Sequence, residues 1–136
     1  MSEKRIKIAV FGLGNGAISE QNKRDAFKMG KLIAESGNYL ITGLAKGITE
    51  FASKGAQSAN GIVIGINPYS KIEEDKNGVS YADTDIVINS GQEDRGRNVV
   101  SVRTGEVMRR IKRKWGVLNE ITIGVGENKP IIVVKN

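Results

Sequence analysis

The sequence of 136 residues contains no cysteine and no histidine. Without cysteine the chain has neither a disulfide framework nor a thiolate metal site. Without histidine it lacks the commonest general base and the commonest metal ligand. Any catalysis must therefore use carboxylates, lysine, tyrosine, hydroxyl groups or main-chain dipoles. We expect no metal site.

Long apolar segments are also missing. No apolar run approaches the roughly 20 residues that a membrane span needs. Residues 1–5 lead directly into a short strand-like run and lack the apolar region and cleavage site of a signal peptide. We therefore expect a cytoplasmic protein that makes no membrane contact. Its length predicts one domain, residues 1–136, with a proper hydrophobic core.

The positive charge of the chain is concentrated in one segment. Lysine and arginine number 21 against 15 aspartates and glutamates, a net charge of +6. Five of the basic residues lie within 109–114, and without them the balance is about +1 (6 minus 5). A uniformly basic, nucleic-acid-binding surface is therefore not indicated. Nucleic-acid binding through residues 109–114 stays an alternative, although Trp115 is the only aromatic residue beside this run.

Short β-rich runs alternate with helical runs along the chain. Strands are expected over residues 6–11, 39–42, 62–66, 85–88 and 131–134, helices over 19–35, 48–58, 98–103 and 118–125, and a surface loop over 69–83. Ser19 is suited to cap the start of the first helix, and Gly37 is suited to follow its end. Apolar strands separated by helices indicate a mainly parallel sheet with helices on both faces. The sequence therefore predicts an α/β fold of the Rossmann-like, doubly wound kind.

Two glycine-rich turns follow the first two expected strands. Residues 12–17 read Gly-Leu-Gly-Asn-Gly-Ala, and residues 42–47 read Thr-Gly-Leu-Ala-Lys-Gly. Glycines let a phosphate approach the main chain at a helix N-terminus, and ligands of parallel sheets bind outside the carboxyl ends of the strands. The positive charge of Lys46 could neutralise a phosphate, although a lysine at such a position is more often only solvated. We predict that a phosphate is bound by Gly12, Gly14, Asn15, Thr42, Gly43 and Gly47.

The first turn also has the spacing of a loose dinucleotide-binding fingerprint, G-x-G-x-x-A. That fingerprint needs an acidic residue near the end of the second strand, where it binds the ribose hydroxyls. Here the strand ends in Ile41-Thr42-Gly43, without an acid. A standard NAD site is therefore rejected. A purely structural role of the glycines, as tight turns, stays open.

Six segments spread over the chain carry a family resemblance. They are residues 8–12, 40–43, 61–66, 96–100, 115–120 and 128–132. Together they resemble the LOG-like family, which also bears a lysine decarboxylase label, in its small bacterial and archaeal branch. That branch is related to the molybdenum cofactor carrier proteins and, more distantly, to DNA-processing protein A. The resemblance implies a Rossmann-like fold, a nucleotide site and a homodimer. No pyridoxal phosphate site is visible, and we expect no cofactor.

Some members of this family are phosphoribohydrolases, which split the bond between a base and ribose 5′-monophosphate. Their signature is an upstream arginine followed by Pro/Gly-Gly-Gly-x-Gly-Thr-x-x-Glu. By resemblance, Arg97 and Glu120 are the implied catalytic residues and Gly116 is an implied phosphate-binding residue. The three early glycines are replaced by Lys-Arg-Lys at 112–114, and the threonine is replaced by Val117.

This altered motif implies weak or absent phosphoribohydrolase activity. Lysine and arginine attract phosphate by charge, but they do not easily adopt glycine conformations and they fill the space of the ligand. Arg97 and Glu120 are then either a catalytic pair or an inherited pair without chemistry. A non-enzymatic carrier of a phosphorylated pterin, the molybdenum cofactor, is the alternative. The sequence thus predicts a nucleotide- or phosphate-binding protein and leaves the ligand open.

Residues 104–118 have an ambiguous pattern. The family places a buried strand over 107–111, which here contains two arginines that would be costly to bury unpaired. A spacing of +3, +4 and +3 indicates instead a helical face formed by Met108, Ile111, Trp115 and Leu118. A strand, a basic amphipathic helix and a locally altered reading frame all stay open.

Overall fold

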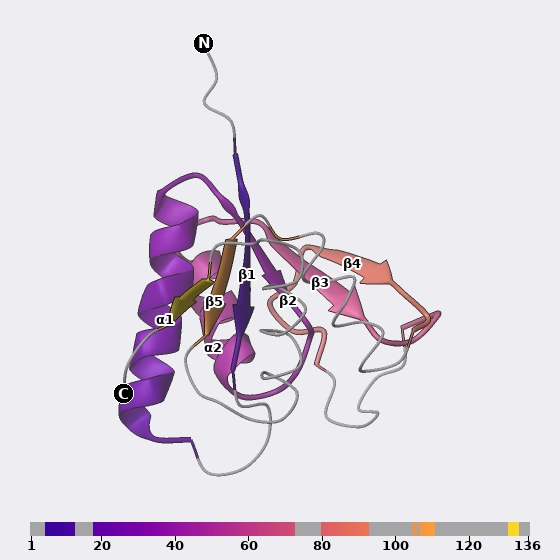
Figure 1. The fold of residues 1–136 in the computed structure, drawn as a ribbon, viewed down its shortest axis with the longest axis horizontal. Helices are drawn as coiled ribbons and strands as arrows, with labels where there is room; N and C mark the ends of the chain where they lie inside the picture. The colour runs from indigo at the N-terminus through magenta and orange to yellow at the C-terminus, as the bar shows by residue number, and fades with distance from the viewer. Residues whose placement is uncertain are drawn as a thin grey trace.

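The computed structural model describes residues 5–12, 18–72, 80–92, 105, 107–110 and 131–133. The elements in this part are β1 (Lys7–Phe11), α1 (Glu20–Glu35), β2 (Tyr39–Thr42), α2 (Ile48–Ser58), β3 (Val63–Asn67), β4 (Ile86–Asn89), β5 (Val107–Arg110) and β6 (Ile131–Val133). The strands form a parallel sheet in the order β4-β3-β2-β1-β5-β6 (Figure 1). Strands β2, β3 and β4 follow one another outward from one edge of β1. Strands β5 and β6 lie beyond the other edge of β1. The predicted α/β, Rossmann-like fold is confirmed.

Helix α1 begins and ends where its local sequence signals predict. The Ser19 side chain accepts a hydrogen bond from the Asn22 N–H at 3.1 Å, which makes Ser19 the N-cap. After the helix, the Gly37 N–H donates to the Ala34 carbonyl at 2.9 Å. Gly37 has a φ of +76°, the left-handed conformation that favours glycine at this position.

Helices α1 and α2 cross with their main chains in contact. A Cβ atom at Gly30 of α1 would lie 2.7 Å from the carbonyl carbon of Ala52 in α2. In the reverse direction, a Cβ atom at Gly55 would lie 2.7 Å from the carbonyl carbon of Phe27. Side chains larger than hydrogen are excluded at both positions, so the two helices form one tightly packed layer.

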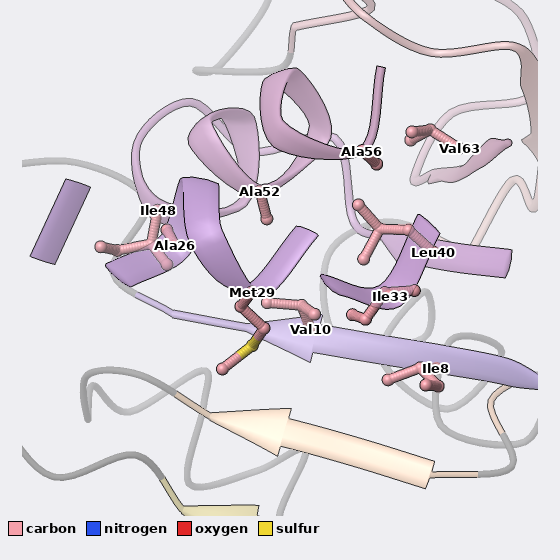
Figure 2. Close-up of a cluster of buried hydrophobic side chains, with 10 residues drawn as sticks. All are labelled: Ile8, Val10, Ala26, Met29, Ile33, Leu40, Ile48, Ala52, Ala56 and Val63. Atoms are coloured by element: carbon pink, nitrogen blue, oxygen red, sulfur yellow. The ribbon is translucent and has the colours of Figure 1, made fainter. Parts of the chain in front are cut away.

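The hydrophobic core lies between this helical layer and the sheet (Figure 2). It is formed by Ile8, Val10, Ala26, Met29, Ile33, Leu40, Ile48, Ala52, Ala56 and Val63. Side chains alternate between the two faces of a strand. Ala9, Phe11 and Ile41 therefore point to the opposite face, where they are only 0%, 4% and 1% exposed. The sheet is buried on both faces at β1 and β2, as their apolar sequences predicted, whereas the edge strand β4 exposes Ile86 and Ile88.

The structure resolves the ambiguity at residues 107–110 in favour of a strand. β5 pairs in parallel with β1, from Ile8 opposite Val107 to Phe11 opposite Arg110, and its other edge pairs with β6. A helix is therefore wrong for this stretch. Hydrogen bonding to two neighbouring strands outweighs the helical spacing of the apolar residues. The helices expected over 98–103 and 118–125 lie outside the described residues.

The other expected strands and helices agree with the structure to within one residue at their ends. The largest difference is a shift of one residue toward the C-terminus for β3 and β4. Among the described residues, no helix has both the length and the apolar character to cross a membrane.

Candidate functional site at the carboxyl ends of β1 and β2

The end of β1 lies directly against the start of α2. Gly12 follows β1, and a Cβ atom at this position would lie 2.7 Å from the Cβ atom of Ile48, the first residue of α2. Only a glycine allows the strand end to pass this close to the helix. The first glycine turn therefore starts beside the N-terminus of α2, and β1 and β2 are adjacent parallel strands. Gly12, the first residue of one glycine turn, therefore lies at the same sheet edge as the second turn, and residues 13–17 are outside the described part.

The N-terminus of α2 has no side-chain cap. Its N-cap residue is Gly47, with a φ of +104°, and no side-chain hydrogen bond closes the helix. In α1 the corresponding position is capped by Ser19. The first main-chain N–H groups of a helix have no partner within the helix, and they carry a partial positive charge. An uncapped helix start of this kind suits an anion such as phosphate.

Thr42 and Leu44 give the second turn its shape. The Thr42 side chain is 2% exposed, and its hydroxyl accepts from the Leu44 N–H at 3.2 Å. Leu44 has a φ of +62°, which is rare for a leucine. Its side chain packs on Gly65 of β3, where a Cβ atom would lie 2.7 Å from Leu44 Cγ. Thr42 therefore contributes to this site by holding the turn.

A shallow surface hollow, open to solvent and without an enclosed interior, lies between the second turn, α2 and the loop before β4. It is lined by Thr42, Leu44, Ala45, Thr49, Glu50, Ser53, Ser80, Ala82 and Thr84. The Ser80 N–H donates to the Leu44 carbonyl at 2.7 Å, which fixes the loop to the turn. Sequence analysis did not point to residues 80–84 or to the polar residues of α2. The only signal was the polar composition of the loop.

Asn67, at the end of β3, ties together the neighbouring loops at the same sheet edge. It is fully buried, and its Nδ2 donates to Asn89 Oδ1 at 2.8 Å and to the Lys71 carbonyl at 3.0 Å. Its Oδ1 accepts from the Tyr81 hydroxyl at 3.1 Å. The Ser90 hydroxyl donates to the Asn67 carbonyl at 2.7 Å. The loops next to the hollow are thus held by one buried amide.

The structure brings together the predicted phosphate-binding residues that it describes. These are Gly12, Thr42, Gly43 and Gly47, all at the carboxyl ends of β1 and β2. The remaining predicted site residues lie outside the described part: Gly14, Asn15, Arg97, Gly116 and Glu120. Within the described residues, no group of three or more acidic side chains is placed to hold a metal ion. The catalytic pair and the homodimer stay predictions.

Comparison with known protein families and sequences gives two matches over nearly the whole chain. The model of the SLOG cluster4 family matches residues 5–136. An uncharacterized protein from Archaeoglobus fulgidus is 33% identical over 133 residues, which are 97% of this chain and 82% of that protein.

Several solved structures are similar to this chain. The molybdenum cofactor binding protein from the phototrophic bacterium Rippkaea orientalis has a TM-score of 0.85 and 32% identity, over 99% of this chain and 79% of that chain. The molybdenum cofactor carrier protein from Chlamydomonas reinhardtii has a TM-score of 0.81 and 27% identity, over 95% and 76%. DNA processing protein A from Helicobacter pylori, with a TM-score of 0.75 and 18% identity over 96% and 66%, shares the fold. The relatives indicated by the sequence motifs are confirmed.

Proposed function

The chain belongs to the SLOG cluster4 family, and from this membership and the geometry of the site we propose that it binds a phosphorylated small molecule at the carboxyl ends of β1 and β2. The ligand that we propose is the phosphorylated pterin of the molybdenum cofactor, which the protein carries without converting it. One observation carries this proposal: Gly12 lies against Ile48, so the first glycine turn begins at the uncapped start of α2.

The phosphate end of the ligand has a suitable place in this arrangement. Main-chain N–H groups at a helix start donate to phosphate oxygens, and the helix dipole favours the negative charge. Lys46, which is exposed and directly precedes the N-cap Gly47, adds a positive charge on the same side. These features support phosphate binding independently of the identity of the rest of the ligand.

The pterin is favoured by the comparisons. Two similar structures, at 32% and 27% identity, are of proteins named for binding or carrying the molybdenum cofactor. The chain has no histidine or cysteine to donate nitrogen or sulfur to a metal. It would therefore hold this cargo through the pterin and the phosphate, as a carrier that must release it would do.

A nucleoside 5′-monophosphate is the second candidate ligand. It is favoured by the match of Arg97 and Glu120 to the phosphoribohydrolase signature. The basic residues at 112–114 argue against efficient hydrolysis, because they stand where that signature has glycines. Calorimetry with GMP, together with an assay for released guanine, separates binding from turnover for this candidate.

The carrier proposal is tested by co-purification. The protein is purified without oxygen from a host that makes the molybdenum cofactor, and molybdenum and the fluorescence of the oxidised pterin are measured per chain. Lys46→Glu places a carboxylate beside the proposed phosphate position, and we expect it to lower the occupancy roughly tenfold. Lys31→Glu makes the same change of charge on an exposed residue near the far end of α1, and it should leave the occupancy unchanged. Absence of both molybdenum and pterin from the wild-type protein, or an equal loss in the two variants, contradicts the proposal.

A further inference from the structure

We propose that two copies of the chain associate through the outer edge of β4, which pairs in antiparallel orientation with β4 of the second copy. Among the described strands, β4 lies at the end of the sheet and pairs with β3 alone (Figure 1). Its side chains Ile86 and Ile88 are 48% and 39% exposed. Both lie on the same face of the strand, because side chains alternate in direction. An edge strand with exposed apolar side chains is a template for pairing with another chain.

The hydrogen bonds to β3 show which main-chain groups of β4 point outward. The Ser90 N–H, directly after the strand, donates to the Asn67 carbonyl at 2.9 Å. Main-chain groups alternate in direction along a strand, so those of Ile86 and Ile88 also point to β3, and those of Val87 point away from it. Within the part of the chain that the structure describes, the Val87 N–H and carbonyl have no hydrogen-bond partner. Val87 therefore offers one donor and one acceptor to a second strand.

The segment around β4 lacks the residues that usually prevent edge pairing. Residues 80–92 contain no lysine, arginine or proline. Asp85, at the bend before the strand, departs from the alternation, since its N–H donates to the Val63 carbonyl at 3.0 Å. Its Oδ2 accepts from the Val63 N–H and from Gln57 Nε2, both at 2.7 Å. The carboxylate is therefore held against β3 and α2, and it is not directed across the free edge.

One antiparallel register matches the two copies best. With Val87 on the two-fold axis, Ile86 of each copy lies opposite Ile88 of the other, in the positions where Cα atoms come within about 4.5 Å. The two Val87 residues exchange two main-chain hydrogen bonds. Asp85 then lies opposite Asn89, so like charges do not face each other. A register shifted by two residues in either direction leaves an isoleucine of each copy opposite a hydroxyl residue.

The size of this contact sets the expected affinity. A strand of four residues contributes a small interface, below the size of most stable dimers. We therefore expect a dissociation constant of about 1 to 100 µM. The antiparallel pairing places the carboxyl ends of the two sheets at opposite edges of the joined sheet. The two candidate phosphate sites then face in opposite directions, so association does not require a ligand.

Sedimentation velocity at concentrations from about 1 to 500 µM measures the association. We expect Ile86→Lys to raise the dissociation constant at least about tenfold, because each dimer contains two altered pairs. Leu32→Lys makes the same kind of change on an exposed residue of α1 that is 53% exposed, and it should have no effect. Ile86→Lys combined with Ile88→Glu sets opposite charges against each other in the proposed register. This variant should associate more tightly than Ile86→Lys combined with Ile88→Lys.

A cross-link tests the register directly, and it also serves if a charged variant does not fold. The chain has no cysteine, so Val87→Cys introduces a single thiol. Hydrogen-bonded antiparallel pairs have Cα atoms about 5.5 Å apart, which suits a disulfide between the two copies. We expect mild oxidation to link this variant much faster than Leu32→Cys.

The contrary results are equally distinct. A wild-type chain that stays monomeric at every concentration overturns the proposal and leaves the β4 edge to an extended segment of a different protein. A dimer that Ile86→Lys does not weaken also overturns it, because that dimer uses another surface. Equal association of the opposite-charge and like-charge variants, or equal cross-linking rates of the two cysteine variants, refutes the β4 pairing.

Discussion

Gly12 and Ile48 are packed so closely that a Cβ atom at position 12 would lie 2.7 Å from the Ile48 Cβ atom and 3.2 Å from its Cγ1 atom. Ile48 is fully buried in the core, so it has no open space into which to move. The contact joins the last part of β1 to the first residue of α2. The position of the candidate phosphate site therefore depends on a glycine that touches the hydrophobic core.

We expect Gly12→Ala to destabilise the protein by about 1 to 3 kcal/mol, because the added methyl group overpacks the core at Ile48. Ile48→Ala alone should cost about 2 to 5 kcal/mol through the cavity that it leaves. In the double variant the new methyl group gains space. The loss of stability of the double variant should therefore be smaller than the sum of the losses of the two single variants. Urea unfolding of the four proteins measures this coupling. Strict additivity would show that the two residues do not meet.

The crossing of α1 and α2 leads to a second prediction. Gly30→Ala and Gly55→Ala each place a methyl group against a main-chain carbonyl group of the other helix, at Ala52 and Phe27. A main-chain carbonyl cannot rotate away as a side chain does, so the helices must separate. We expect a loss of about 1 to 3 kcal/mol for each variant, although alanine has the higher helix propensity. Thermal unfolding tests this, and a stabilised variant at either position would contradict the close crossing.

Gly37 provides a contrast, because its requirement is conformational and not steric. No atom lies within 4 Å of a Cβ atom built there, and its φ is +76°. We expect Gly37→Ala to cost about 1 to 2 kcal/mol through the left-handed backbone. Gly37→Asn should cost less, because asparagine tolerates this conformation better. An equal cost in the two variants would assign the effect to something other than the backbone conformation.

The N-cap of α1 carries its own prediction. Ser19→Ala removes the acceptor for the Asn22 N–H at 3.1 Å and should cost about 1 kcal/mol. Ser19→Asp, which keeps an acceptor and adds a favourable charge at the helix start, should retain most of the stability. Urea unfolding of both variants checks the order, and an alanine variant as stable as the aspartate variant would argue against the cap.

The features of this fold that sequence alone predicts are those specified within a few residues. The cap by Ser19, the glycine after α1 and the apolar strands each depend on neighbours in the chain. The shared sheet edge of Gly12 and Gly43 was also predictable, because parallel strands place their carboxyl ends at one edge.

Contacts between distant residues determine the features that were not predictable. Leu44 has a positive φ, and its side chain packs on Gly65 of another strand. No local sequence pattern predicts a leucine in that conformation. The strand at 107–110 is selected by its two neighbouring strands against a helical spacing of its apolar residues. The hollow joins α2 to residues 80–84, which the sequence shows only as part of a polar loop.

Asp85, which directly precedes β4, provides the last prediction. Its Oδ2 accepts from the Val63 N–H and from Gln57 Nε2, both at 2.7 Å, and so ties the edge strand to β3 and α2. Asp85→Ala removes both bonds, and we expect a cost of about 1 to 3 kcal/mol, because hydrogen bonds to charged groups are stronger than neutral ones. Asp25→Ala is the matched control. Asp25 also accepts from a glutamine Nε2, that of Gln21 at 2.8 Å. Both glutamine bonds are exposed, but the Asp25 bond lies within one helix and joins no separate elements. The control should cost less than about 0.5 kcal/mol. Hydrogen exchange of the β4 amides should accelerate in Asp85→Ala and not in Asp25→Ala. Unchanged β4 exchange in Asp85→Ala would show that the edge strand is held without this carboxylate.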